Sequence, residues 1–242
     1  MTRPPWSHRI ALLLLLSLPL GTPIAHGSPP TKSTTEVIID FWNYKDPKNN
    51  KLVLVPYIID PTIKAIPSRI PAINAAIAHM AKFTCVRFVP RTNQPNYIKF
   101  INGEGCYSNI GVYGGEQALS VGNGCDKKIG YILHDMTHAL GFMHEDTRPD
   151  RDQFVTINLQ NVKADARDQF AMVRDLGTQG LPYDYLSVMH HPPTDFSANG
   201  SPTITTKDVT FQHKIGQRNG LSPLDIQKIN KRYKCETSAP AP

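Results

Sequence analysis

Apolar positions in the first half of the chain recur with the spacings of strands and helices in turn. Residues 51–59 (KLVLVPYII) predict a strand, and Pro56 favours an edge position because proline cannot donate a hydrogen bond to a neighbouring strand. Apolar residues at helical spacing then predict a helix over residues 68–80, with Ser68 as its cap. Two further strands are predicted over residues 85–89 and 97–101.

The remaining pattern is poorer in regular elements. The glycines of residues 103–124 do not form a GxGxxG spacing before a helix, so they predict close-packed strands and turns. Helices are expected over residues 128–141, near residues 161–173, and from Ser222 to about Tyr233. In the last of these helices, Ser222 is a good cap, Pro223 fits the first position, and Ile226 and Ile229 should face inward. This order predicts one catalytic domain in two lobes, divided just after Gly141.

The N-terminus has the features of a secretory signal peptide. Arg3 and Arg9 give it a positive start, residues 10–20 are apolar, and the small-residue pattern at residues 25–27 offers a cleavage site. No second apolar run has membrane-spanning length. We therefore expect a secreted, extracellular protein with no membrane partner once the signal is removed. The predicted segments are a signal peptide (1–27), a short propeptide or mature N-terminal segment (28–50), a catalytic domain (51–235) and a tail (236–242).

An exported protein can form disulfides and can be glycosylated. The four cysteines are expected to form two disulfides, since no CxxC pair is present to favour a cysteine zinc site. Three pairings are possible, and cysteine spacing does not choose among them. Asn199 begins a glycosylation sequon, which Pro202 weakens.

The net charge of +6 raises the question of a polyanionic partner. Basic residues are scattered, apart from a C-terminal group on the last predicted helix and its exit: Lys228, Lys231, Arg232 and Lys234. A solvated basic face explains such a group, so no nucleic-acid partner is expected.

The stretch HDMTHALGFMHED, residues 134–146, carries the candidate chemistry. His134 and His138 lie four positions apart and therefore share one face of the predicted helix. Gly141 can end that helix in a left-handed conformation, after which the chain turns back and brings His144 from another direction. Three neutral imidazoles with an open fourth position are typical of a catalytic zinc ion.

This HxxxHxxGxxH stretch resembles the zinc motif of metzincins, and its neighbours narrow the resemblance to the astacin family of metalloendopeptidases. The resemblance runs from about Val53 to Cys235. Its motifs are VPYIID, CVRFVPR, GCYSNIG, GGEQALSVGNGC, HEDTRPDRDQFVTINLQNV, DYLSVMHH and IGQRNGLSPLDIQKINKRYKC. It implies an α+β metzincin-type fold: an N-terminal lobe with a mixed twisted sheet and helices, a cleft, and a loop-rich C-terminal lobe with a terminal helix.

The resemblance also implies roles for individual residues. His134, His138 and His144 would bind one Zn2+, and Met189 would form an apolar floor beneath it. Glu145 would contact the new N-terminus after propeptide removal. The disulfides would pair Cys85 with Cys235 and Cys106 with Cys125. A peptide or protein substrate would occupy the cleft of a monomeric enzyme.

Two residues depart from the family pattern where the chemistry takes place. Asp135 stands where the general base is usually glutamate, and it is one methylene shorter. His191 stands where astacins carry a tyrosine that approaches zinc. Histidine could donate a hydrogen bond in its place, or could bind zinc and close the open position. The FxGD segment that commonly keeps astacin precursors latent is also absent between Ser28 and Leu52.

Two hypotheses from different classes follow. The first is a secreted zinc endopeptidase whose activity is reduced by Asp135 and His191. The second is a zinc-binding pseudoprotease that binds peptides or partners without cleaving them. Both retain the zinc ligands, so the ligands do not discriminate between the two hypotheses.

Overall fold

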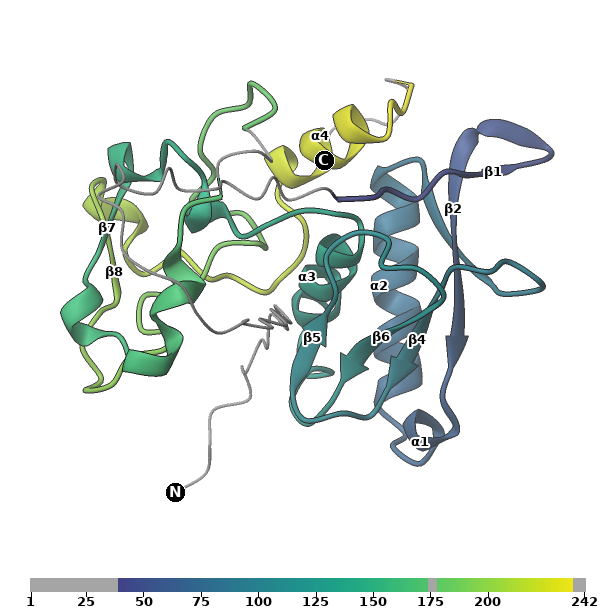
Figure 1. Ribbon diagram of the computed structural model, residues 1–242, viewed down its shortest axis with the longest axis horizontal. Coiled ribbons are helices and arrows are strands. Elements are labelled where there is room, and N and C mark those ends of the chain that lie inside the picture. Colours follow the sequence, from purple (N-terminus) through teal and green to yellow (C-terminus); the bar gives the residue numbers. More distant parts are fainter. Residues whose placement is uncertain (1–38, 174–177, 237–242) are drawn as a thin grey trace, which may run out of the picture.

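The computed structural model describes residues 39–173 and 178–236. The predicted signal peptide, residues 28–38 of the predicted 28–50 segment and nearly all of the C-terminal tail lie outside these residues. A sheet with its helices forms one side of the molecule, and a loop-rich part with β7 and β8 forms the other (Figure 1). Helix α3 runs between them.

A mixed six-stranded sheet forms the first part, in the order β1-β2-β4-β6-β5, with β3 paired to the other side of β2. Strands β2, β3, β4 and β6 are mutually parallel where they pair, whereas β1 and β5 are antiparallel to their neighbours. The strands are β1 Tyr44–Asp46, β2 Asn49–Ile59, β3 Val86–Pro90, β4 Tyr97–Ile101, β5 Cys106–Ser108 and β6 Glu116–Val121.

The expectation that Pro56 marks an edge strand is wrong, because β2 lies inside the sheet. Val53 donates its amide to Cys85 on the β3 side. Amides alternate in direction along a strand, so the nitrogen of Pro56 faces the opposite side. On that side β1 pairs only as far as Leu54, and β4 begins to pair at Tyr57. The proline therefore falls in the gap between two partner strands, where no donor is needed.

Two helices cover the apolar face of the sheet. These are α2 (Arg69–Phe83) and α3 (Ile129–Ala139), and both bury apolar side chains against the strands. The fully buried side chains of this core include Val55, Ile73, Met80, Ile98, Phe100, Leu119, Ile132, Leu133 and Met136. Within the described part of the chain, no helix is long and apolar enough to cross a membrane.

Ser68 does not cap α2 with its side chain, contrary to expectation. Its backbone is already helical, and its hydroxyl donates to the carboxylate of Asp126 instead. The amide of Arg69 is satisfied by the carbonyl of Ile66, in the turn that follows the short helix α1 (Pro61–Lys64). A capping serine accepts from the second or third amide of its helix, and here the third residue is Pro71, which has no amide hydrogen to donate.

The second part of the molecule has its own apolar cluster and little regular structure. The antiparallel pair of β7 (Val155–Ile157) and β8 (Ile204–Thr206) forms one wall of it. The helix expected near residues 161–173 is only a 3-10 helix, Ala164–Phe170. Only Ala166 and Phe170 of this segment are buried, and so few apolar contacts do not sustain a regular α-helix.

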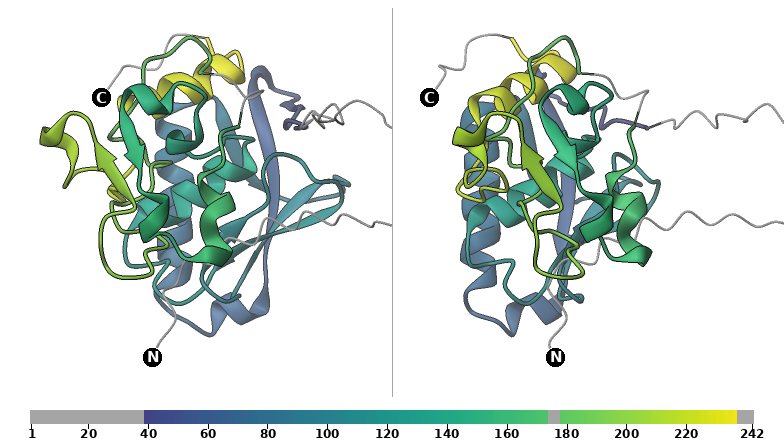
Figure 2. Two further views of the ribbon diagram at one scale, coloured as in Figure 1. Left: turned by 60° about the vertical axis from the view of Figure 1, so that its left-hand side comes forward. Right: turned by 90° about the vertical axis from the view of Figure 1, so that its left-hand side faces the viewer.

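Helix α4 (Pro223–Arg232) joins the two parts. Ser222 caps its start and Pro223 takes the first position, as the sequence predicts, and Asp225 completes a reciprocal capping box with Ser222. Ile226 and Ile229 face inward and belong to the same apolar core as α2 and α3. The helix lies across one end of the molecule in all three views (Figures 1 and 2).

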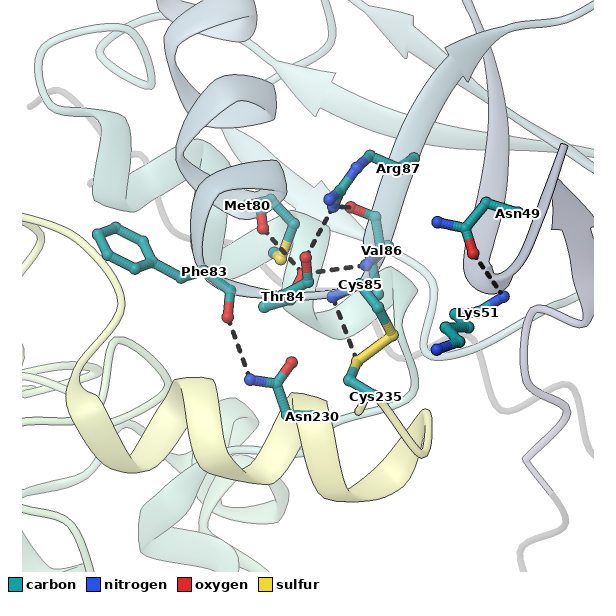
Figure 3. Close-up of a disulfide and its surroundings, with 10 residues drawn as sticks. All are labelled: Asn49, Lys51, Met80, Phe83, Thr84, Cys85, Val86, Arg87, Asn230 and Cys235. Carbon is teal, nitrogen blue, oxygen red and sulfur yellow. Dashed lines mark hydrogen bonds between the residues drawn. A yellow bond between two sulfur atoms is a disulfide. The ribbon is translucent and has the colours of Figure 1, made fainter. Parts of the chain in front are cut away.

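Two disulfides are present, Cys85–Cys235 and Cys106–Cys125, in the pairing that the family resemblance implies. The first ties the end of α4 to the start of β3 (Figure 3). Beside it, the Asn230 side chain donates to the carbonyl of Phe83 at 3.1 Å. The C-terminal helix is therefore held to the start of β3 by a covalent bond and to the end of α2 by a hydrogen bond beside it.

The disulfide that closes the longer loop should contribute more to the free energy of unfolding. The two bridges close 150 and 19 residues of chain, for which loop entropy predicts about 5 and about 3 kcal/mol. We expect the double substitution Cys85→Ala with Cys235→Ala to lower the free energy of unfolding more than Cys106→Ala with Cys125→Ala. Guanidinium unfolding of both proteins measures the difference. A greater loss in the second protein would contradict this order.

Candidate functional site

Helix α3 ends in a turn that brings the three histidines of residues 134–146 together. Gly141 has φ +90° and donates to the carbonyl of His138 at 2.7 Å, and Phe142 donates to Thr137 at 3.2 Å. These two bonds form a Schellman motif, in which a left-handed residue ends the helix. The chain then reverses and carries His144 back towards the helix face that bears His134 and His138.

Side chains from distant segments satisfy the carbonyls at the end of α3. The indole of Trp42 donates to Ala139 at 2.8 Å, and the hydroxyl of Tyr233 donates to Leu140 at 2.9 Å. The amide of Gly111 adds a second donor to the carbonyl of His138 at 2.9 Å. Buried helix ends need such partners. The position of the turn that follows α3 is thus fixed by the N-terminal segment, the loop between β5 and β6, and the end of α4 together.

The three histidines meet through their Nε2 atoms. Nε2 of His144 lies 3.0 Å from Nε2 of His138 and 3.3 Å from that of His134. All three rings are buried, and among the described residues they form the group suited to hold a metal ion. Tetrahedral zinc with Zn–N bonds of about 2.0–2.1 Å requires nitrogens about 3.3 Å apart. The observed spacing therefore fits zinc.

Backbone carbonyls select the tautomer that leaves Nε2 for the metal. Nδ1 of His134 donates to the carbonyl of Val188, and Nδ1 of His138 donates to that of Phe142, both at 2.8 Å. A carbonyl can only accept, so in both rings the proton lies on Nδ1. Burial lowers the pKa of His138 to about 4, which keeps this ring neutral near pH 7. Both features are expected of imidazole zinc ligands.

Asp135 follows the first histidine on α3 and is completely buried. Neither of its carboxylate oxygens has a hydrogen-bond partner among the described residues. Burial raises the pKa of Asp135 well above its ordinary value, and the charge of Arg218 opposes that rise only in part. A buried carboxylate without a protein partner, beside a metal-binding cluster, is suited to a metal ion and its bound water.

Arg218 is the buried cation of this region, and the sequence alone did not single it out. Its guanidinium donates to the carbonyls of His190 and Gln217, at 3.1 and 2.9 Å. Its charge acts on Asp135, Asp146 and Asp195. It therefore offsets part of the negative charge around the metal-binding cluster.

His191 lies beside the cluster but outside the metal-binding group. Its ring centroid is 3.9 Å from that of His144. Among the described residues, His134, His138 and His144 have ring nitrogens that all lie within 4.8 Å of one another, and His191 is not part of that group. Nδ1 of His191 donates to the carboxylate of Asp146, at 2.9 Å to Oδ2. Burial alone would lower the pKa of His191, but the charge and hydrogen bond of Asp146 raise it above its ordinary value.

The segment around Met189 is held from the C-terminal helix. Asp225 accepts from the Ser187 hydroxyl at 2.5 Å and from the amide of Val188 at 2.8 Å. The carbonyl of Val188 in turn orients His134. Met189 is buried, and its carbonyl accepts from the amide of Glu145 at 3.1 Å, so this turn lies against the segment that carries His144. The role of Met189 as a floor under the metal stays a prediction.

Glu145 is buried and already has several partners. It forms ion pairs with Arg148, at 2.9 Å, and with Lys228 of α4, and it accepts from the amide of Asp184 at 2.8 Å. A contact between Glu145 and the N-terminus of a mature chain stays a prediction. Any such ammonium group would have to share this carboxylate with two cations. Asn199, the predicted glycosylation site, is exposed, as an acceptor asparagine must be.

Three residues that shape the site were not predicted from the sequence. Asp146 and Asp225 read as ordinary acids of a loop and of a helix start, and Arg218 reads as one of many scattered cations. Asp146 meets a residue 45 positions away, and Asp225 meets residues 37 and 38 positions away. No local spacing predicts contacts of that range.

Comparison with known proteins places these features in a family. A family model described as Astacin matches residues 44–234. Blastula protease 10 of Paracentrotus lividus is 38% identical over 205 residues, and zinc metalloproteinase nas-6 of Caenorhabditis elegans is 40% identical over 198 residues. They cover 81% and 78% of this chain, but the chain spans only 32% and 56% of their own lengths.

A solved structure is similar over almost the whole described chain. High choriolytic enzyme 1, a hatching enzyme zinc-protease of Oryzias latipes, superposes with a TM-score of 0.74 at 37% sequence identity. The match covers 87% of this chain and all of the other. The fold class expected from the sequence, an α+β metzincin-type domain, is confirmed by this similarity.

The donors at the end of α3 should be important for stability. Tyr233→Phe removes only a hydroxyl and leaves the carbonyl of Leu140 buried without that donor. We expect it to lower the free energy of unfolding by about 1–3 kcal/mol. Tyr113 is 75% exposed, and Tyr113→Phe should change stability by less than about 0.5 kcal/mol. Denaturant unfolding of the two variants checks this, and equal effects would contradict it.

Burial of Asp135 should make the stability of the metal-free protein depend on pH. Its raised pKa means that the folded state retains a proton that the unfolded state releases. The wild-type protein should therefore lose stability as the pH rises above about 4, whereas Asp135→Asn does not ionise. In urea unfolding of metal-free protein, Asp135→Asn should exceed the wild type at pH 7 and match it near pH 4. An unchanged difference between the two pH values would contradict this.

Proposed function

Because the chain belongs to the astacin family, we propose that it is a secreted zinc-dependent metalloendopeptidase with reduced activity. The observation that carries the proposal is the convergence of three buried Nε2 atoms, two of them in rings whose Nδ1 is held by a carbonyl. Beside them is a carboxylate that has no hydrogen-bond partner among the described residues. Three imidazoles leave a fourth position for water and substrate. Two disulfides agree with an exported protein.

The residues of this chain would divide the work of hydrolysis as follows. His134, His138 and His144 would hold one zinc ion, which would polarise the scissile carbonyl and acidify water. Asp135 would take a proton from the attacking water and pass it to the leaving amine. His191, whose ring lies beside that of His144, would donate a hydrogen bond to the carbonyl oxygen of the substrate. A peptide segment of a protein would be the substrate.

Reduced activity follows from the position and length of Asp135. The side chain is one methylene shorter than glutamate, and a displacement of about 1 Å can cost about a hundredfold in rate. Burial also favours the protonated form of Asp135, which cannot accept a proton. A bound cation would oppose that effect by favouring the carboxylate.

The cluster of three histidines beside the buried carboxylate of Asp135 also supports a second candidate function, a zinc-binding pseudoprotease. In this alternative Asp135 stays withdrawn in its buried position, and His191 does not replace the expected tyrosine. The cleft would then bind peptides or a protein partner without cleavage. The fold and the metal-binding cluster are common to both functions, so only an activity measurement separates them.

The test is hydrolysis of a mixed peptide library by purified mature protein, with zinc content measured in each sample. We expect slow cleavage by the wild type, abolished by chelation, and faster cleavage by Asp135→Glu, by up to about 100-fold. The double variant Asp135→Glu with His191→Tyr is the positive control for the scaffold. A silent wild type with full zinc, beside an active double variant, would overturn the enzyme proposal in favour of the pseudoprotease.

A further inference from the structure

Asp146 and His191 form a buried pair next to the metal-binding cluster. Asp146 is completely buried in the 3-10 helix Glu145–Thr147, directly after the third histidine and its neighbouring acid. Its Oδ1 accepts from the backbone amide of His191 at 3.1 Å. Nδ1 of the same residue lies 3.1 Å from Oδ1 and 2.9 Å from Oδ2. One carboxylate thus holds both the backbone and the ring of His191.

The surroundings leave the ring little freedom. It lies against His144 on one side, with ring centroids 3.9 Å apart. The rings of Phe170 and Phe196 lie 5.8 and 5.5 Å from it. With Nδ1 held by the carboxylate, Nε2 is on the opposite edge of the ring.

His191 is oriented in the same way as the predicted zinc ligands. In His134 and His138, an oxygen atom holds Nδ1–H and Nε2 is turned to the metal position. In His191 the oxygen belongs to a carboxylate, which holds the proton on Nδ1 more strongly than a carbonyl does. However, His191 has no nitrogen within 4.8 Å of all three ligand nitrogens. The ring is therefore placed beside the metal position and leaves the fourth coordination position open.

We propose that Asp146 is a positioning residue for His191, fixing the ring with the proton on Nδ1 so that Nε2 is the nitrogen presented to the substrate beside the zinc ion. The part that concerns substrate rests on the proposed peptidase function, whereas the part that concerns the ring does not. The two adjacent acids Glu145 and Asp146 then have separate tasks. Glu145 holds Arg148 and Lys228, and Asp146 holds His191.

The orientation of the ring is measured by NMR of the zinc-loaded protein, from the 15N shifts of the two ring nitrogens of His191. In the wild type, Nδ1 should be protonated. In Asp146→Asn the single amide oxygen is engaged by the backbone amide, and the NH2 group faces Nδ1, so the proton should move to Nε2. Asp152→Asn is the matched control, since Asp152 is an exposed acid of the following turn, and it should leave the spectrum unchanged.

A proton on Nε2 alone in the wild type would overturn the proposal, and so would an unchanged His191 spectrum in folded Asp146→Asn. If Asp146→Asn does not fold, as judged by its near-ultraviolet circular dichroism and zinc content, the wild-type spectrum decides by itself. Protonated Nδ1 then supports the proposal. Neither NMR measurement requires that the protein cleave peptides. Failure of the proposal for Asp146 is therefore distinct from failure of the peptidase proposal.

Where the wild type cleaves peptides, a double-mutant cycle tests the functional part. Asp146→Asn should lower kcat by about 10- to 100-fold, as is usual for residues that orient a metal-site histidine, with little change in KM. In the His191→Phe background, the same substitution should have no further effect on kcat. Effects that multiply fully across the two positions would show that Asp146 acts independently of His191.

Discussion

The site depends on where helix α3 stops. Gly141 takes a left-handed conformation, and a Cβ added to it would lie 2.5 Å from the Phe41 ring, so both the backbone and the packing require glycine. Ending the helix here lets Phe142 turn its carbonyl back to His138 and lets His144 approach from outside the helix. Two histidines on one helix face and a third from the returning chain make a three-sided cluster, which one continuous helix could not provide.

Electrostatics explains why the site combines neutral histidine rings with buried acids and buried cations. Imidazoles whose Nδ1–H is held by a carbonyl remain neutral when buried and present a lone pair. The acids differ in their partners: Asp146 is stabilised as a carboxylate by His191, which holds its pKa well below the ordinary range, whereas Asp135 lacks a protein partner and has a raised pKa. Two carboxyl groups of the same type, eleven residues apart, are thereby given opposite tendencies to ionise.

The sequence predicted the features that depend on local spacing. The histidine motif, the strand at residues 97–101 and the C-terminal helix with its capping box all follow from periods and caps within a few residues. Pro56 misled because its effect depends on which neighbours pair on each side, and Ser68 because the third residue of its helix, Pro71, has no amide for a side-chain cap. Asp146 and the donors Trp42 and Tyr233 act on residues 45 to 97 positions away, and Arg218 acts through its charge. No local pattern in the sequence predicts these contacts.

The central claim is that three histidines bind zinc and leave a position open for water and substrate, with His191 beside the metal and not on it. X-ray absorption spectroscopy of the zinc-loaded protein tests this most directly, because it counts imidazole and oxygen ligands. The account predicts three imidazole nitrogens at about 2.0–2.1 Å with oxygen completing the shell. Four imidazole nitrogens without oxygen would contradict it, since His191 would then close the site and zinc would be structural.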